Sequence, residues 1–248
     1  METETSKPTL LMLHGFTGSP ASWDAVSTCL GSRYRLIRPY LPGHHPDDTT
    51  CPDFDGAGSH IAALLSALPK PRTLMGYSLG GRLALYTTIH YPHLVDRLIL
   101  ESATAGIADD AERAARKGAD DQLAQNLRTK GLSWFVEYWE TLPLFESHKN
   151  LPEPVRAAQR KQRLAHTTEG LAQSLERMGA GVMPSLWGHL QHVTCPVRLI
   201  TGTLDVRYTT IAREMISHLP HARHILIPNA GHSIHLEQPQ LLCDAILH

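Results

Sequence analysis

The hexapeptide GYSLGG, residues 76–81, lies between the apolar run TLM (73–75) and the segment RLALY (82–86). An apolar run before it and a helix-like segment after it predict a strand, a sharp turn and a helix, with Ser78 at the turn. Small residues beside the serine let the chain turn sharply, so that the hydroxyl projects at the edge of a sheet. The alternative is an ordinary glycine turn, and motifs elsewhere in the sequence decide between this turn and a catalytic serine.

Other short apolar runs resemble the one before Ser78, because they end in glycine or turn-forming residues and are followed by helix-like segments. They are TLLMLHG (9–15), RLIRPYLPG (35–43), RLILES (97–102), VRLITG (197–202) and HILIPNAGH (224–232). Near-continuous apolar strands that alternate with helices predict an α/β fold, with a mostly parallel sheet covered on both faces. Ligands of such sheets bind beyond the carboxyl ends of the strands.

The interval from about residue 103 to residue 193 contains no strand candidate. It holds helical patterns such as DDAERAARKGADDQLAQNL (109–127) and VRAAQRKQRLAHTTEGLAQSLERM (155–178). Because further strands follow this interval, we expect a helical cap over the strand ends rather than a second domain. Residues 1–248 are therefore predicted to form a single domain.

A serine hydroxyl is a weak nucleophile and a weak base until an imidazole takes its proton, and a carboxylate must fix the tautomer of that imidazole. In the chain order serine, acid, histidine, both partners should follow Ser78. Asp205 in TGTLDVRY comes just after the strand that ends at Gly202, and His232 comes just after the last strand. The sequence therefore predicts a catalytic triad of Ser78, Asp205 and His232.

Other assignments of the acid and the base have to be weighed. Asp205 is also a candidate N-cap or surface acid, since aspartate commonly begins helices. His235 is the nearest rival of His232, which is favoured because it comes first after the strand and because Gly231 leaves room for close approach. Three other aspartates precede the serine and break the expected order: Asp24, Asp53 and Asp55.

The loop LHGFTGS (13–19) follows the first strand and is where a second amide of an oxyanion hole is expected. The predicted donors are the backbone amides of Phe16 and Leu79, whereas His14 is expected to be structural. Arg82 lies one turn after Ser78 on an otherwise apolar segment. A partly buried guanidinium without a nearby acid needs an anion, and a substrate carboxylate beside the serine would supply it.

Composition excludes several classes of partner. A net charge of −1 over 248 residues gives no general attraction to nucleic acid or to an anionic membrane. The apolar stretch 10–13 is far too short for a signal peptide core or a membrane span, which favours a cytoplasmic protein. The 4 cysteines are scattered and are expected to be reduced thiols, and the 16 histidines lack metal-ligand spacing, so neither a metal nor another cofactor is expected.

Over essentially its full length, the chain resembles proteins of the α/β-hydrolase fold, through the G-x-S-x-G turn, the triad order and the LHGFTGS loop. Only eight residues precede the first predicted strand. The resemblance therefore implies a sheet that lacks the amino-terminal hairpin common in that family. This fold serves esterases, C–C hydrolases, lyases and non-catalytic receptors, so the fold does not decide the reaction.

A narrower resemblance is to the 2-succinyl-6-hydroxy-2,4-cyclohexadiene-1-carboxylate synthases of menaquinone biosynthesis. It rests on LHGFTGS (13–19), GYSLGGRLAL (76–85), ERAARKGADDQ (112–122), the pair Tyr138–Trp139 and the stretches GTLDVRY (202–208) and AGHSIH (230–235). It implies a lyase that eliminates pyruvate from a small polycarboxylate, 2-succinyl-5-enolpyruvyl-6-hydroxy-3-cyclohexene-1-carboxylate, with Ser78 as general base. The implied substrate-binding residues are Arg82, Arg116, Arg163, Tyr77 and Trp139.

Alternatives stay open at this point. Arg116 and Arg163 lie in charged helical stripes, which are also typical of a solvated face, and Trp139 is equally compatible with a core position. A serine carboxylesterase or a C–C bond hydrolase would use the same triad as its nucleophile system. A non-enzymatic binding protein is disfavoured because binding alone does not require all three triad residues. The chain is also compatible with a homo-oligomer.

Overall fold

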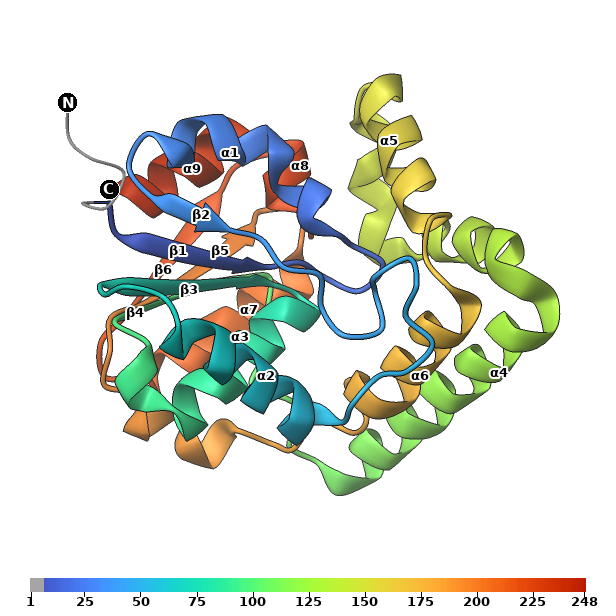
Figure 1. Cartoon of the computed structure of the whole chain (residues 1–248), viewed down its shortest axis with the longest axis horizontal. Helices are drawn as coiled ribbons and strands as arrows, with labels where there is room; N and C mark the ends of the chain where they lie inside the picture. The colour runs from blue at the N-terminus through green and yellow to red at the C-terminus, as the bar shows by residue number, and fades with distance from the viewer. Residues whose placement is uncertain (1–6) are drawn as a thin grey trace.

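The computed structural model describes residues 7–248, and its centre is a parallel sheet with the strand order β2-β1-β3-β4-β5-β6 (Figure 1). The strands are β1 Thr9–Leu13, β2 Arg35–Ile37, β3 Arg72–Tyr77, β4 Arg97–Glu101, β5 Val197–Gly202 and β6 Ala222–Ile227. Every predicted strand is confirmed, and within residues 7–248 no strand precedes β1. The edge strands β2 and β6 end earlier than predicted because Pro39 and Pro228, which lack an amide hydrogen, follow closely.

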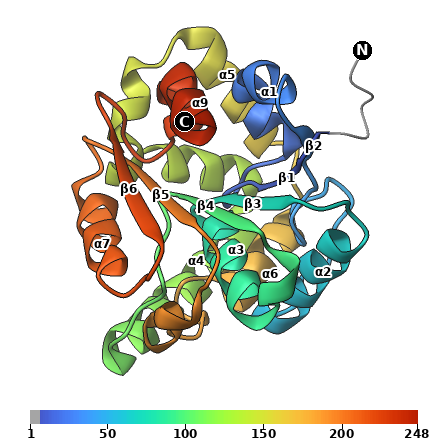
Figure 2. The ribbon, with the colours of Figure 1, turned by 90° about the vertical axis from the view of Figure 1, so that its left-hand side faces the viewer.

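Both faces of the sheet are buried, which explains why its central strands are apolar at almost every position. Successive side chains of a strand point to opposite faces. Leu10 and Met12 of β1 accordingly pack in one apolar cluster, whereas Leu11 and Leu13 pack in the other. Figures 1 and 2 show α1 and α9 over the first face and α2 and α3 over the second.

The helices around the sheet follow the strands in alternation. They are η2 Pro20–Trp23, α1 Asp24–Gly31, α2 Phe54–Ser66, α3 Leu79–His90, η3 Pro92–Leu94, α7 Val206–Ile216, α8 Ile234–Glu237 and α9 Pro239–Leu247. No helix within residues 7–248 combines the length and the apolar character that crossing a bilayer requires.

The segment between β4 and β5 is helical and lies beyond the carboxyl ends of the strands (Figure 1). It contains α4 Asp110–Glu140, η4 Pro143–Asn150, α5 Glu153–Arg163, α6 Thr168–Met178 and η5 Trp187–His192. Helix α4 bends at Gly131, whose φ of 83° favours glycine. An apolar cluster joins α4 to α6, and Arg128 donates to Glu169 at 2.8 Å and to Glu176 at 2.9 Å.

A disulfide joins Cys29 of α1 to Cys243 of α9, with Cα atoms 6.4 Å apart. The expectation that all the cysteines are reduced is therefore corrected. The two residues are 214 positions apart in the sequence and meet because α1 packs on α9, which their spacing does not reveal. Cys51 and Cys195 are free thiols, and burial raises the pKa of Cys51 to about 12 and that of Cys195 to about 11.

Candidate active site

Ser78 occupies the turn between β3 and α3 and has a φ of 51° and a ψ of −109°. This left-handed conformation is unusual for a residue with a side chain and points the hydroxyl away from the strand. The flanking glycines are required by space. A Cβ on Gly76 would lie 2.2 Å from the Gly80 carbonyl oxygen, and a Cβ on Gly80 would lie 2.2 Å from the Leu13 carbonyl oxygen. The hexapeptide is thus a strand, elbow and helix junction rather than an ordinary turn.

Three side chains from separate parts of the chain meet at this elbow. His232 Nε2 lies 3.1 Å from Ser78 Oγ, and His232 Nδ1 lies 2.7 Å from Asp205 Oδ2. Both His232 and Asp205 are almost completely buried. The carboxylate accepts the Nδ1 hydrogen and leaves Nε2 free to accept the serine proton, which is the arrangement a Ser-His-Asp base requires.

Asp205 is also the N-cap of α7, which is the alternative role that the sequence offers for it. Its Oδ1 accepts from the Tyr208 amide at 3.2 Å. The loop that carries His232 is held by a residue that the sequence did not single out. Glu237 accepts from the Gly231 amide at 2.7 Å and from the Ser233 amide at 3.2 Å. These two hydrogen bonds hold the backbone amides of the residues before and after His232.

His235, the rival base, has a different partner. Its Nδ1 lies 2.7 Å from Glu101 Oε1, and both side chains are buried. Its ring packs against Tyr77 with centroids 4.5 Å apart, and the Tyr77 hydroxyl lies 2.7 Å from Ser233 Oγ. The structure therefore pairs Ser78 with His232 and assigns His235 to a buried network behind the site.

The two amides predicted to form an oxyanion hole flank the elbow. Leu79 is the first residue of α3, where a backbone amide has no intrahelical acceptor. Phe16 lies in the loop after β1, and both residues line the cavity in front of Ser78. His14 is structural, as expected: its Nε2 accepts from the Leu41 amide at 3.0 Å, and burial lowers its pKa to about 3, so it stays neutral.

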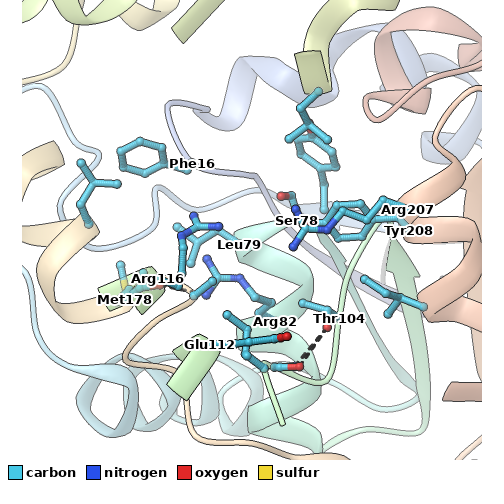
Figure 3. A pocket seen from close by; sticks show the side chains of 18 of the residues that line it. Phe16, Ser78, Leu79, Arg82, Thr104, Glu112, Arg116, Met178, Arg207 and Tyr208 are labelled. Atoms are coloured by element: carbon cyan, nitrogen blue, oxygen red, sulfur yellow. Dashed lines mark hydrogen bonds between the residues drawn. The ribbon is translucent and has the colours of Figure 1, made fainter. Parts of the chain in front are cut away.

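A cavity of about 450 Å³ opens above Ser78 between the sheet and the cap (Figure 3). Its wall includes four of the predicted substrate-binding residues: Tyr77, Arg82, Arg116 and Trp139. Trp139 also packs against Phe16, with ring centroids 5.1 Å apart, so the pocket and core interpretations both apply to it. Among residues 7–248, no cluster of three or more metal-ligating side chains is positioned to hold a metal ion.

Arg82 contributes a positive charge to this wall, and within residues 7–248 no carboxylate forms an ion pair with it. Its Nη1 donates to the Met178 carbonyl oxygen at 3.1 Å, and its guanidinium lies 5.8 Å from the centre of the Phe54 ring. Burial, together with the charge of Arg116, lowers its pKa to about 10, so it remains charged near neutral pH. Arg116 differs, because its Nε donates to Asp120 at 2.8 Å.

Arg163 does not line the cavity that contains Ser78. Its Nη1 donates to Glu140 at 3.0 Å, and its guanidinium lies 5.7 Å from the centre of the Phe145 ring. It borders a second cavity of about 370 Å³ between η4 and α5, and Phe145 forms part of the wall of both cavities. The structure thus places Arg82 and Arg116 on the wall of the cavity that contains Ser78, and Arg163 on the wall of a neighbouring cavity.

Comparison with known proteins agrees with this geometry. The sequence profile of the alpha/beta hydrolase family matches residues 10–245. The chain is 38% identical to a Bacillus subtilis (strain 168) protein provisionally assigned as 2-succinyl-6-hydroxy-2,4-cyclohexadiene-1-carboxylate synthase, over 97% of this chain and 89% of the relative. It is 31% identical to the synthase of that name from Serratia proteamaculans (strain 568), over 96% of this chain and 91% of the relative.

Solved structures show the same relationship. The structure of MenH from S. aureus matches with a TM-score of 0.93 and 33% identity, over 100% of this chain and 93% of that chain. A thermophilic esterase from Thermogutta terrifontis, determined with malate bound, matches with a TM-score of 0.84 and 25% identity, over 97% of this chain and 89% of that chain. The chain therefore belongs to the alpha/beta hydrolase family, within the branch that contains these synthases.

Proposed function

We propose that this protein is a lyase that eliminates pyruvate from 2-succinyl-5-enolpyruvyl-6-hydroxy-3-cyclohexene-1-carboxylate and yields 2-succinyl-6-hydroxy-2,4-cyclohexadiene-1-carboxylate. Two relatives that share 31% and 38% identity with the chain along most of their length carry the name of this synthase. A cytoplasmic location and a homo-oligomeric state stay predictions from the sequence.

The observation that supports the proposal most is the charge beside the serine. Arg82 is half-buried one turn after Ser78, and its hydrogen bond goes to the Met178 carbonyl oxygen rather than to a carboxylate. A desolvated guanidinium is costly without an anion, and a carboxylate satisfies it with charge-assisted hydrogen bonds. A substrate with several carboxylates suits this cavity better than a neutral ester does.

In the proposed reaction the triad acts as a base on carbon. His232 accepts the Ser78 proton, and the serine oxygen removes a proton from the ring carbon that carries the succinyl group. The electron pair shifts through the succinyl carbonyl and the ring double bond and breaks the C–O bond to the enolpyruvyl group. Protonation of the expelled enolpyruvate by the His232 imidazolium gives pyruvate and restores the triad. Neither an acyl-enzyme nor a water molecule takes part.

The other proposed roles follow from charge and position. Negative charge that develops on the succinyl ketone oxygen is stabilised by the amides of Phe16 and Leu79. Arg82 and Arg116 bind substrate carboxylates, and Tyr77 and Trp139 form apolar walls. Burial keeps the pKa of Tyr77 well above its ordinary value, so its hydroxyl stays protonated beside Ser233. A substrate-binding role for Arg163 stays a prediction, because this residue lines neighbouring cavities and not the one that contains Ser78.

The test is to supply the enolpyruvyl precursor to the purified protein and to follow pyruvate with lactate dehydrogenase and NADH. The proposal expects one pyruvate for each diene formed, and loss of most of the activity in a folded Ser78→Ala variant. A small aryl ester serves as the comparison substrate. Rapid ester hydrolysis with an acylated Ser78 and no pyruvate from the precursor would establish the carboxylesterase instead.

A further inference from the structure

Arg207 is an additional cation on the wall of the cavity that contains Ser78. It lies in the first turn of α7, two residues after Asp205. In Figure 3 it approaches Ser78 from the side of Tyr208, whereas Arg82 and Arg116 lie on the opposite side of the serine. The arginines that line the cavity thus come from three elements: α7 for Arg207, α3 for Arg82 and α4 for Arg116.

Nothing within the described part of the chain neutralises Arg207. The arginines held by ion pairs among residues 7–248 are Arg38, Arg113, Arg116, Arg128, Arg160 and Arg163. A cation in the first turn of a helix lies at the positive end of the helix dipole, where its charge does not stabilise the helix. Arg207 is exposed to solvent, and its charge does not stabilise the helix, so the guanidinium is free to meet an anion that enters the cavity.

Acidic residues also line the cavity, but none of them pairs with Arg207. Asp109 accepts from the Glu112 amide at 2.8 Å and caps α4, and Glu112 and Glu214 are exposed. Within residues 7–248, no ion pair joins any of these three carboxylates to Arg207. They leave the charge of Arg207 available to an anion that reaches Ser78.

The number of cations can be compared with the number of charges on the substrate. The enolpyruvyl precursor carries three carboxylates, on the ring, on the succinyl chain and on the enolpyruvyl group. The guanidinium groups that line the cavity belong to Arg82, Arg207 and Arg116, of which Arg116 uses its Nε to pair with Asp120, whereas Arg163 lines a neighbouring cavity. Resting on the proposed function for the identity of the ligand, we propose that Arg207 binds the third carboxylate of the substrate and selects tricarboxylates over dicarboxylates.

The experiment measures equilibrium binding of tricarballylate and succinate by calorimetry, without any turnover. Loss of a charged hydrogen bond predicts that Arg207→Gln binds tricarballylate about tenfold to a hundredfold more weakly than the wild type. Binding of succinate should change much less, and Arg207→Lys should retain part of the affinity because it keeps the charge. Arg213→Gln is the matched control, since Arg213 is exposed in the last turn of the same helix and does not line the cavity.

Two outcomes would overturn the inference: tricarballylate that binds Arg207→Gln as tightly as the wild type, and tricarballylate that fails to bind the wild type. An equal loss in Arg213→Gln would also overturn it, because the effect would then come from net charge. The binding experiment is independent of pyruvate release. Failure of the proposed reaction would therefore be seen separately, as a wild-type protein that binds the tricarboxylate and forms no pyruvate.

Discussion

Replacing Asp205 with asparagine tests the hydrogen bonds of the site, because this carboxylate accepts from two donors at once. His232 Nδ1 lies 2.7 Å from one oxygen, and the Tyr208 amide lies 3.2 Å from the other. An asparagine side chain has one oxygen and one NH₂ group, so it cannot accept from both donors. One of the two interactions must be lost in Asp205→Asn.

The magnitude depends on which interaction is lost. If the NH₂ group faces His232, the ring hydrogen moves to Nε2, which can then no longer take the Ser78 proton, and kcat falls by about a thousandfold or more. If the oxygen faces His232, the NH₂ group opposes the Tyr208 amide and α7 loses its cap, at a cost of about 1 kcal/mol. We expect the first outcome, since the Tyr208 amide has a fixed direction whereas the imidazole tautomer is free to change.

The assay is steady-state pyruvate release, combined with urea unfolding of the same samples. Asp205→Asn should lose kcat with little change in KM and in the free energy of unfolding. The control is Asp53→Asn, because Asp53 caps α2 by accepting from the Gly56 amide at 2.9 Å, away from the cavity. This control should keep full activity. Near wild-type kcat in Asp205→Asn would refute the role given to the tautomer.

The remaining predictions concern charge, packing and pH. Arg82→Ala should raise the KM for pyruvate release by about tenfold to a hundredfold through loss of a charged hydrogen bond, and an unchanged KM would remove the charge argument. Gly80→Ala should unfold far below the wild-type melting temperature, because its Cβ would lie 2.2 Å from the Leu13 carbonyl oxygen. Gly118→Ala should melt at or above the wild-type temperature, because a Cβ at position 118 would meet no heavy atom within 4 Å. Equal melting temperatures of the two variants, measured by circular dichroism, would contradict the close contact between Gly80 and β1. Stability should fall as the pH drops from 6.5 toward 3, because His14 has a folded pKa of about 3 against 6.5 for the free side chain and takes up a proton on unfolding. His14 should add up to about 1.4 kcal/mol per pH unit to the slope that urea unfolding measures, and His44, His148 and His166, whose pKa values burial also lowers, add to the same slope. A flat profile in that range would count against their buried neutral state.

The fold could be predicted because its determinants are local. A parallel strand buried on both faces is apolar at almost every position, as in β1 and β3, so its sequence differs from that of the flanking helices. The elbow is local too, since Gly76 and Gly80 are required by contacts only a few residues away or with the adjacent strand. The triad partners could be predicted because the carboxyl ends of parallel strands meet at one edge of the sheet.

The directions of the cap side chains could not be predicted from the sequence, because contacts between distant segments orient them. Arg163 lies on α5, and its contacts with Glu140 and Phe145 belong to the neighbouring cavity, which its place in the sequence does not reveal. The pair of Glu101 and His235 was missed for the same reason, as these residues are far apart in the chain. The pair Arg207–Tyr208 after the predicted catalytic acid is part of the resemblance to the synthases, but the sequence alone assigns no role to Arg207.

In the proposed reaction, the Ser78 hydroxyl removes a proton from carbon and forms no covalent bond to the substrate. The most direct measurement is a single-turnover reaction with precursor carrying deuterium at the ring carbon bonded to the succinyl group. We expect pyruvate to appear more slowly from the deuterated substrate than from the ordinary one, while the mass of the intact protein stays unmodified throughout. Equal rates accompanied by a covalent adduct on that serine would contradict it.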